Sequence, residues 1–184
     1  MPGRLAACPG AHRPGGVPLT GTELGTLAVG PARVALRRAT DADLPALVRL
    51  LADDPLGAGR ELTPDDEADL SPYRRAFARI ATDPAQLLVV AVDGTEVLGT
   101  LQLSVIPSLS RQGALRAQVE AVRVRGDQRG RGLGEAMFRW VVEEARRRGC
   151  ALVQLTTDVT RADARRFYER LGFVASHVGL KLAL

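Results

Sequence analysis

One short segment near residue 130 constrains this chain of 184 residues more than any other. It reads Arg-Gly-Arg-Gly-Leu-Gly over 129–134 and separates a predicted strand, Ala117–Val124, from a helix that apolar spacing extends to Arg148. Glycine tolerates positive φ and close approach of a ligand, and the free N–H groups of a helix N-terminus attract anions. Two arginines add fork-shaped donors. A tight turn alone needs fewer glycines, so the segment predicts a site for phosphate or pyrophosphate.

The spacing of the glycines narrows the choice of phosphate ligand. A P-loop needs a lysine that is missing here, and a dinucleotide fingerprint needs Gly or Ala where Glu135 or Met137 stands. Asp158 does follow the next strand, where a ribose-binding acid would stand, so NAD is disfavoured rather than excluded. The segment fits the acetyl-CoA pattern Gln/Arg-x-x-Gly-x-Gly/Ala. A second pattern, Ala-x-x-Phe-Tyr-x-x-x-Gly-Phe, lies over Ala164–Phe173. The two motifs together resemble those of the GCN5-related N-acetyltransferase (GNAT) family.

The resemblance covers residues 34–184 in element order and is motif-specific over about 117–173. It implies an α/β (α+β) domain with a mixed, mostly antiparallel sheet flanked by helices, whose central fourth and fifth strands splay apart to admit acetyl-CoA. It also implies an acetyl-CoA-dependent N-acetyltransferase that acts on a primary amine of a small molecule or peptide, by direct attack in a ternary complex. A non-catalytic acyl-CoA-binding regulatory module is the alternative. No metal is expected.

The resemblance also assigns cofactor-binding residues. The pantetheine would bond to the backbone of Val122, Arg123 and Val124. The pyrophosphate would lie against amides of Arg129, Gly130, Arg131, Gly132, Leu133, Gly134 and Glu135. Many members of the family carry an asparagine three residues before the motif alanine, and it contacts the cofactor. This chain has Arg161 there, which we retain as a cofactor-binding candidate in place of that asparagine.

Two residues are candidates for proton transfer. An amine with a pKa of ~10.4 is almost entirely protonated at neutral pH, so a base is needed. The resemblance places Glu120 at the position of a carboxylate general base and Tyr168 beside the sulfur, as general acid to the thiolate. The plainer interpretations are a solvent-facing charge or a partner of Arg116 or Arg123 for Glu120, and core packing for Tyr168. Strict alternation puts Glu120 on one face with Val122 and Val124, unless a β-bulge near Val122 alters it.

The remaining pattern predicts the element order. Strands are expected at 34–36, 87–92, 97–106, 117–124, 150–157, 173–175 and 179–184. Helices are expected at 40–53, from 71 to about 81, up to 148, and from 160 to about 171, with capping-box-like starts at Thr40–Asp43 and Thr160–Asp163. Residues 1–32 are rich in Pro and Gly and predict a flexible tail, so the N-acetyltransferase domain is expected over 33–184.

Charge and composition limit the partners. Residues 1–110 have a formal net charge of −3 and residues 111–184 one of +7, which favours an anionic ligand for the second half. Aromatic residues are only 4%, too few for the stacking surfaces of a nucleic-acid binder, so none is expected. No apolar run approaches the ~20 residues of a membrane span, and no secretory signal is evident. We expect a cytoplasmic enzyme with no membrane partner, and a homodimer is possible.

Overall fold

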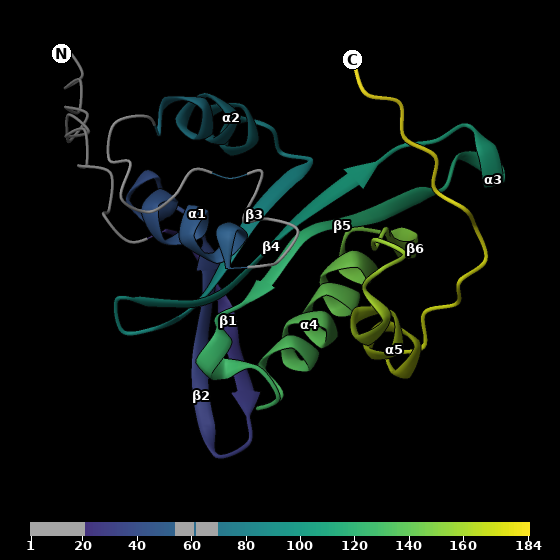
Figure 1. Cartoon of the computed structure of the whole chain (residues 1–184). Coiled ribbons are helices and arrows are strands. Elements are labelled where there is room, and N and C mark those ends of the chain that lie inside the picture. The colour runs from purple at the N-terminus through teal and green to yellow at the C-terminus, as the bar shows by residue number, and fades with distance from the viewer. Residues whose placement is uncertain (1–20, 54–60, 62–69) are drawn as a thin grey trace, which may run out of the picture.

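The computed structural model describes residues 21–53, 61 and 70–184, and these form a sheet of six strands in chain order (Figure 1). The strands are β1 (Glu23–Val29), β2 (Ala32–Arg38), β3 (Gln86–Asp93), β4 (Glu96–Ile106), β5 (Leu115–Val124) and β6 (Cys150–Leu155). The helices are α1 (Leu44–Ala52), α2 (Ser71–Thr82), α3 (Ser110–Gly113), α4 (Leu133–Arg147) and α5 (Ala162–Arg170). Neighbouring strands are antiparallel except β5 and β6, which are parallel. The mixed, mostly antiparallel sheet is therefore confirmed.

The sheet begins earlier than the sequence indicated. β1 lies within the segment 1–32 that was predicted to be a flexible tail, and it pairs with β2 from Glu23↔Arg37 to Val29↔Ala32. Gly30, with φ 55°, and Pro31 form the connecting turn. Gly and Pro mark hairpin turns as well as linkers, which is why composition alone misassigned this part. The folded domain therefore includes residues 23–32, and residues 1–20 of the predicted tail lie outside the described residues.

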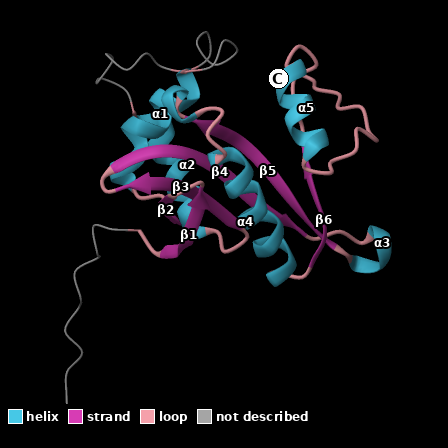
Figure 2. Cartoon of the chain, turned by 90° about the horizontal axis from the view of Figure 1, so that it is seen from below, coloured by secondary structure: helices cyan, strands magenta, loops and turns pink. Residues whose placement is uncertain are grey.

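Helices pack against both faces of the sheet and form two apolar cores. On one face, Met137 and Phe138 of α4 are almost fully buried against strand residues such as Leu101. On the other face, Leu47 of α1 is buried around Val90. α5 stands at the end of the sheet opposite α1 and α2, beyond β6 (Figure 2). None of the described helices has the length and apolar character needed to cross a membrane.

The predicted helices and central strands agree with the structure within a few residues, but two predictions near the end of the chain are wrong. The short strands expected at 173–175 and 179–184 are absent, because in the described chain no backbone hydrogen bonds join this segment to β6. α5 begins at Ala162 without the capping box predicted at Thr160–Asp163. The hydroxyl and backbone N–H of Thr160 bond to Asp158 instead.

An ion pair between Arg37 and Asp43 holds the connection between β2 and α1 in place. Nη1 and Nη2 of Arg37 donate to the two carboxylate oxygens of Asp43 at 2.7 and 2.8 Å. The same carboxylate accepts the backbone N–H of Thr40 at 2.7 Å, which confirms the capping box at Thr40–Asp43. Burial by itself would raise the pKa of Asp43, but the bonds from Arg37 and Thr40 outweigh burial and hold the pKa below its usual value.

We predict that Asp43→Asn lowers the free energy of unfolding by about 2–3 kcal/mol, because Arg37 loses its charged partner. The pKa of Asp43 is lower in the folded than in the unfolded state, where it is ~3.9. The stabilisation is therefore complete above that pH and is lost as the pH falls through the folded-state pKa. Urea denaturation from about pH 7 to pH 2 measures this, and the difference between wild type and variant should shrink at the acid end.

The matched control for this prediction is Asp41→Asn. The Asp41 carboxylate is exposed and lies 3.8 Å from Arg74, so its loss should change stability by less than about 0.5 kcal/mol. Equal losses from the two substitutions would contradict the role given to Asp43.

Candidate active site

β5 and β6 separate halfway along β5. Their parallel pairing runs from Leu115↔Cys150 to Val119↔Leu155 and stops there. β5 continues to Val124, still paired with β4, while the chain after β6 leads to α5. Beyond Val119 the outer edge of β5 therefore has no strand partner among the described residues, and its N–H and C=O groups are open to a ligand. This is the predicted splay of the fourth and fifth strands, which are β5 and β6 once β1 is included.

A β-bulge at Ala121 decides which side chains face which way at this opening. Ala121 has φ 51°, and the pairing with β4 shifts there by one residue. Glu120 and Arg123 consequently pair with two β4 residues on one face, so they share that face. The strict alternation that put Glu120 with Val122 and Val124 is therefore wrong. Both valines pack against the core that α4 covers.

Glu120 is exposed on its face of the sheet. Within the described residues it forms no hydrogen bond or ion pair, so the interpretation that it partners Arg116 or Arg123 is not supported. An accessible, unpaired carboxylate can accept a proton directly or through a water molecule. The geometry therefore leaves Glu120 able to act as a base.

Glu120 lies opposite Gln102, among polar side chains that sequence reasoning missed. The side chains of Gln86 and Gln102 bond at 3.0 Å between β3 and β4, and those of Gln118 and Gln154 bond at 2.7 Å between β5 and β6. Gln118 lies two residues before Glu120 and shares its face. Polar residues at alternating positions in otherwise apolar strands were the available signal. These glutamines form a polar row, which gives this face of the sheet donors and acceptors for a polar ligand.

The glycine-rich segment forms the turn into α4. Gly130 has φ 74° and Gly132, the N-cap of α4, has φ 90°, and an added Cβ at either would meet nothing within 4 Å. A Cβ at Gly134 would lie 3.5 Å from the ring of Phe167 and 3.7 Å from the side chain of Val124. The start of α4 therefore sits between the end of β5 and α5. The free N–H groups of its first turn face this opening region, where they suit an anion.

Arg129 is used differently from the expectation. Its backbone N–H donates to Gly126 at 3.3 Å, and its guanidinium donates to the carbonyl of Val124 at 3.0 Å and the carboxylate of Asp53 at 2.9 Å. The backbone N–H and the guanidinium of Arg129 therefore both hold the turn in place. We interpret Arg129 as a residue that positions the turn. Arg131 forms no ion pair with the described residues, so its charge is available to a phosphate.

Tyr168 both packs in the core and faces positive charge. Its ring lies edge-on to Phe138 and Phe167, each with a centroid distance of 5.3 Å, so the core-packing interpretation is correct as far as it goes. Burial raises the pKa of the Tyr168 hydroxyl, and the charges of Arg161 and Arg123 oppose this rise. The structure thus brings together Tyr168, Arg123 and Arg161 from three different parts of the chain.

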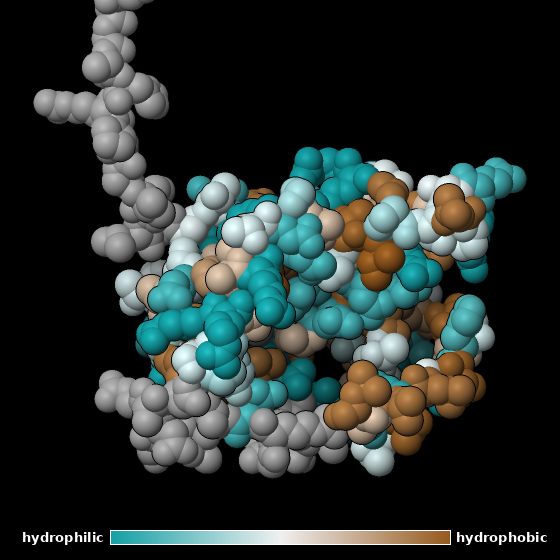
Figure 3. Space-filling view, turned by 90° about the horizontal axis from the view of Figure 1, so that it is seen from above, coloured by the Kyte–Doolittle hydropathy of each residue, from teal (hydrophilic) through white to brown (hydrophobic). Residues whose placement is uncertain are grey.

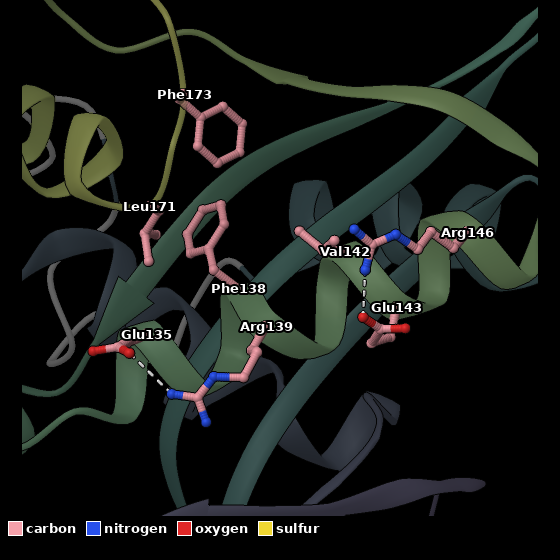
Figure 4. A pocket seen from close by; sticks show the side chains of 8 residues that line it. All are labelled: Glu135, Phe138, Arg139, Val142, Glu143, Arg146, Leu171 and Phe173. Atoms are coloured by element: carbon pink, nitrogen blue, oxygen red, sulfur yellow. Dashed lines mark hydrogen bonds and ion pairs between the residues drawn. The ribbon is translucent and has the colours of Figure 1, made fainter.

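A pocket of about 200 Å³ lies on the outer side of α4, and it does not suit the pyrophosphate (Figure 4). Phe138, Leu171 and Phe173 form its apolar side. Its arginines, Arg139 and Arg146, are each paired with a glutamate of the same helix. These pairs neutralise the positive charge, so the pocket offers little attraction to a phosphate. No group of three or more His, Cys, Asp or Glu side chains in the described chain is arranged to hold a metal.

Comparison with known proteins identifies the family. A model of the acetyltransferase (GNAT) family matches residues 44–173. The chain belongs to the GNAT family. Aminoalkylphosphonate N-acetyltransferase of Salmonella typhimurium is 32% identical over 119 residues, covering 65% of this chain and 77% of that protein. Glucosamine 6-phosphate N-acetyltransferase 1 of Oryza sativa subsp. japonica is 32% identical over 133 residues, covering 69% and 77%. The crystal structure of a transcriptional regulator from Bacillus halodurans C-125 has a TM-score of 0.78 at 46% identity, covering 82% and 99%.

Membership of the GNAT family confirms the resemblance and makes this chain an acetyl-CoA-dependent N-acetyltransferase. The matched range includes the glycine-rich segment and ends at Phe173, the last residue of the second motif. The curated relatives are N-acetyltransferases of small amines, matched over about three quarters of their own length. The fold, the reaction class and the transferred group therefore agree.

We predict that Gly132→Ala weakens acetyl-CoA binding and lowers the free energy of unfolding by about 1–2 kcal/mol. A Cβ is disfavoured at φ 90°, so the turn must change and the first amides of α4 move with it. Gly94→Ala is the matched control, because Gly94 has φ 57° in the β3–β4 hairpin, away from the site. It should lose similar stability but keep its affinity. Titration calorimetry measures the affinities, and equal affinities in the two variants would refute the assignment.

Proposed function

We propose that this GNAT enzyme transfers the acetyl group of acetyl-CoA to a primary amine of a small molecule, by direct attack in a ternary complex. The observation that supports this best is the opening beyond Val119. The free edge of β5 lies on one side of it, and the turn into α4 lies against the end of the same strand. The pantetheine arm of acetyl-CoA could form hydrogen bonds with the edge of β5, while the pyrophosphate of the same cofactor lies at the turn into α4.

The residues at the opening fit acetyl-CoA in shape and charge. The backbone of Val122, Arg123 and Val124 offers the strand edge for the pantetheine amides. Open space around Gly130 and Gly132 leaves room for a pyrophosphate beside the N-terminal amides of α4, and Arg131 adds a positive charge. Glu135 is paired with Arg139, which reduces repulsion between its carboxylate and a phosphate.

Proton removal from the acceptor is assigned to Glu120. The carboxylate takes a proton from the ammonium group, directly or through water, and the neutral amine nitrogen attacks the thioester carbonyl. A C–N bond forms as the C–S bond breaks, the CoA thiolate leaves, and the nitrogen releases its second proton to solvent to give the neutral amide. Glu120 supports this role because it is exposed, has no partner among the described residues, and shares its face with the polar row. The row would bind the polar groups of the acceptor.

Protonation of the thiolate is assigned to Tyr168. With pKa values of about 8.5 for a thiol and ~10 for tyrosine, the transfer is uphill by about 2 kcal/mol. Burial of Tyr168 adds to this cost, since it raises the hydroxyl pKa further. Arg161 and Arg123 reduce this cost, because their positive charges stabilise the tyrosinate that forms. The cluster therefore limits, without cancelling, the cost that burial adds.

We further propose that the acceptor carries a phosphonate or phosphate group. The names of both curated relatives specify amines of this kind. On this chain, Arg123 lies on the same face of the sheet as Glu120. The charge of Arg161, like that of Arg123, acts to lower the pKa of Tyr168. These two cations could hold the anionic end of an acceptor whose amine reaches Glu120. The alternative, a non-catalytic acyl-CoA-binding module, would bind acetyl-CoA without releasing CoA thiol to any amine.

We predict that Glu120→Gln and Tyr168→Phe separate the two proton transfers. Each should lower kcat by about 10²- to 10⁴-fold and leave acetyl-CoA affinity within about threefold of wild type. Release of CoA thiol measures turnover, and calorimetry measures affinity. The matched controls are Glu96→Gln and Tyr73→Phe, since Glu96 bonds Arg125 and Tyr73 bonds Glu61, both outside the opening. Unchanged turnover in either site variant removes that residue from the mechanism.

We predict that Arg161→Gln raises KM for aminoalkylphosphonates by about 10- to 100-fold but changes KM for uncharged amines by less than about threefold. Loss of one positive charge weakens the binding of an acceptor that carries an anionic group, but not the binding of an uncharged acceptor. Arg170→Gln, which removes a charge from the C-terminal end of the same helix, is the control. Steady-state kinetics on both acceptor classes tests this, and equal effects on them would contradict a phosphonate-binding role while leaving acetyl transfer intact.

A further inference from the structure

Arg116 of β5 is a partly buried arginine that has no partner among the described residues. Its Nε atom is buried, and no acceptor lies within hydrogen-bonding distance of it. A buried N–H group without an acceptor costs free energy, and the cost is greater when the group is charged. Native structures rarely keep such a group without a reason. The position of Arg116 therefore indicates a cation that waits for an acceptor from a ligand.

The side chains nearest to Arg116 in the sheet do not accept a hydrogen bond from it. Its cross-strand partners are Ile106 of β4 and Leu152 of β6, whose side chains are apolar. The next side chain of β5 on the same face is that of Gln118, and its carbonyl oxygen already accepts from Gln154 at 2.7 Å. The sheet thus surrounds the guanidinium with apolar groups and with a polar pair that is bonded to itself.

Arg116 lies on the same face of the sheet as Glu120. Side chains alternate along a strand, and both residues precede the bulge at Ala121, so positions 116, 118 and 120 share a face. Four residues of a strand span about 13 Å. A long side chain that leans along the strand shortens this span, so an acidic group on Arg116 would lie roughly 8–13 Å from an amine at Glu120.

A hollow beside this part of the sheet leaves room for a ligand. In the space-filling view it lies between the body of the molecule and an apolar strip at the lower right (Figure 3). The strip belongs to the C-terminal segment, residues 174–184, in which Leu180 is 93% exposed. The segment passes Thr156, just after β6, where a Cβ on Gly179 would lie 3.9 Å from the threonine side chain. The hollow therefore lies next to β6, the strand that pairs with the half of β5 that holds Arg116.

Arg116 and Arg123 lie on opposite sides of Glu120 along β5. The acidic group of a short aminophosphonate is assigned to Arg123 and Arg161, close to the amine. Positions 116 and 123 are about 20 Å apart along the strand, so one small acidic group cannot contact both. Arg116 consequently offers a second site, for an acidic group that is distant from the amine.

We propose that Arg116 binds the acidic group of an elongated acceptor, in which this group lies roughly 8–13 Å from the amine that is acetylated. A carboxylate or phosphate accepts paired hydrogen bonds from a guanidinium and would supply the acceptor that Nε lacks. The inference rests on the proposed role of Glu120, which places the amine at the other end. It adds long amines with a distal acidic group to the acceptors of this enzyme.

A series of ω-amino acids tests the distance. The acceptors are β-alanine, 6-aminohexanoate and 8-aminooctanoate, each compared with its uncharged amide. Wild type should have a KM for 8-aminooctanoate about 10- to 100-fold below that for the amide, and Arg116→Gln should remove this preference. Arg33→Gln is the matched control, because Arg33 is an exposed cation on β2, three strands away, and it should keep the preference. A preference that survives in Arg116→Gln overturns the inference.

The same kinetics distinguish this inference from the proposed function. Arg161→Gln should raise KM for 2-aminoethylphosphonate, and Arg116→Gln should raise it for 8-aminooctanoate alone. If no amine releases CoA thiol, the proposed function fails, and calorimetry with 8-aminooctanoate and the CoA complex still decides about Arg116. The expected result is an affinity at least 10-fold lower in Arg116→Gln than in wild type. Equal affinities, or no binding to wild type, overturn the inference.

Thermal unfolding separates a binding role from a structural one. Because Arg116 forms no hydrogen bond or ion pair in the described chain, Arg116→Gln should melt no lower than wild type. Excess 8-aminooctanoate should raise the Tm of wild type with bound CoA and leave that of the variant unchanged. A variant that melts lower without ligand would mean that the arginine stabilises the fold, and this result would also overturn the inference.

Discussion

The structure of the site depends on the point at which β5 and β6 stop pairing. Up to Val119 the two strands are one sheet, and beyond it β5 keeps β4 on one side and has no strand of the described chain on the other. The bulge at Ala121 lies just past this point. It shifts the register with β4 by one residue, so the side chains that follow change faces of the sheet. A non-glycine residue at φ 51° costs on the order of 1–3 kcal/mol, which the packing of Val122 and Val124 against the α4 core offsets. Without the bulge, Glu120 and Arg123 would lie on opposite faces.

A cluster of aromatic rings sets the position of the second side of the opening. Phe138 of α4 lies within 5.3–5.8 Å of Phe167, Tyr168 and Phe173 by ring centroids. The cluster joins the helix that begins at the glycine-rich turn to the helix that holds Tyr168. Because α4 is also packed against β5, the N-terminal amides, the strand edge and the tyrosine hydroxyl are held by one apolar core. Edge-on aromatic pairs of this kind each add about 0.5–1.5 kcal/mol beyond their buried area.

The sequence predicted what is local and missed what depends on distant contacts. The turn at 129–134 and the motif at 164–173 follow from short-range glycine and helix rules, and both are where they were expected. The partner of Arg129 is Asp53, 76 positions earlier, and no spacing rule reveals such a pair. The bulge at Ala121 likewise depends on the register with β4. β1 was missed because Gly and Pro mark turns and linkers alike. The final strands were predicted from a real alternation of apolar residues, but the segment pairs with no strand among the residues that the structure describes.

In the mechanism we propose, the arginines beside Tyr168 would affect both acceptor binding and proton transfer. Arg123 and Arg161 oppose the rise in the hydroxyl pKa that burial causes, so they make Tyr168 a better acid when the acceptor site is empty. An acceptor phosphonate bound to them would neutralise part of this charge and raise the tyrosine pKa again. A bound acceptor would therefore make Tyr168 a weaker acid, so the negative charge that develops on the sulfur would have to drive the transfer. One pair of cations would thus bind the acceptor at some cost to the acid step.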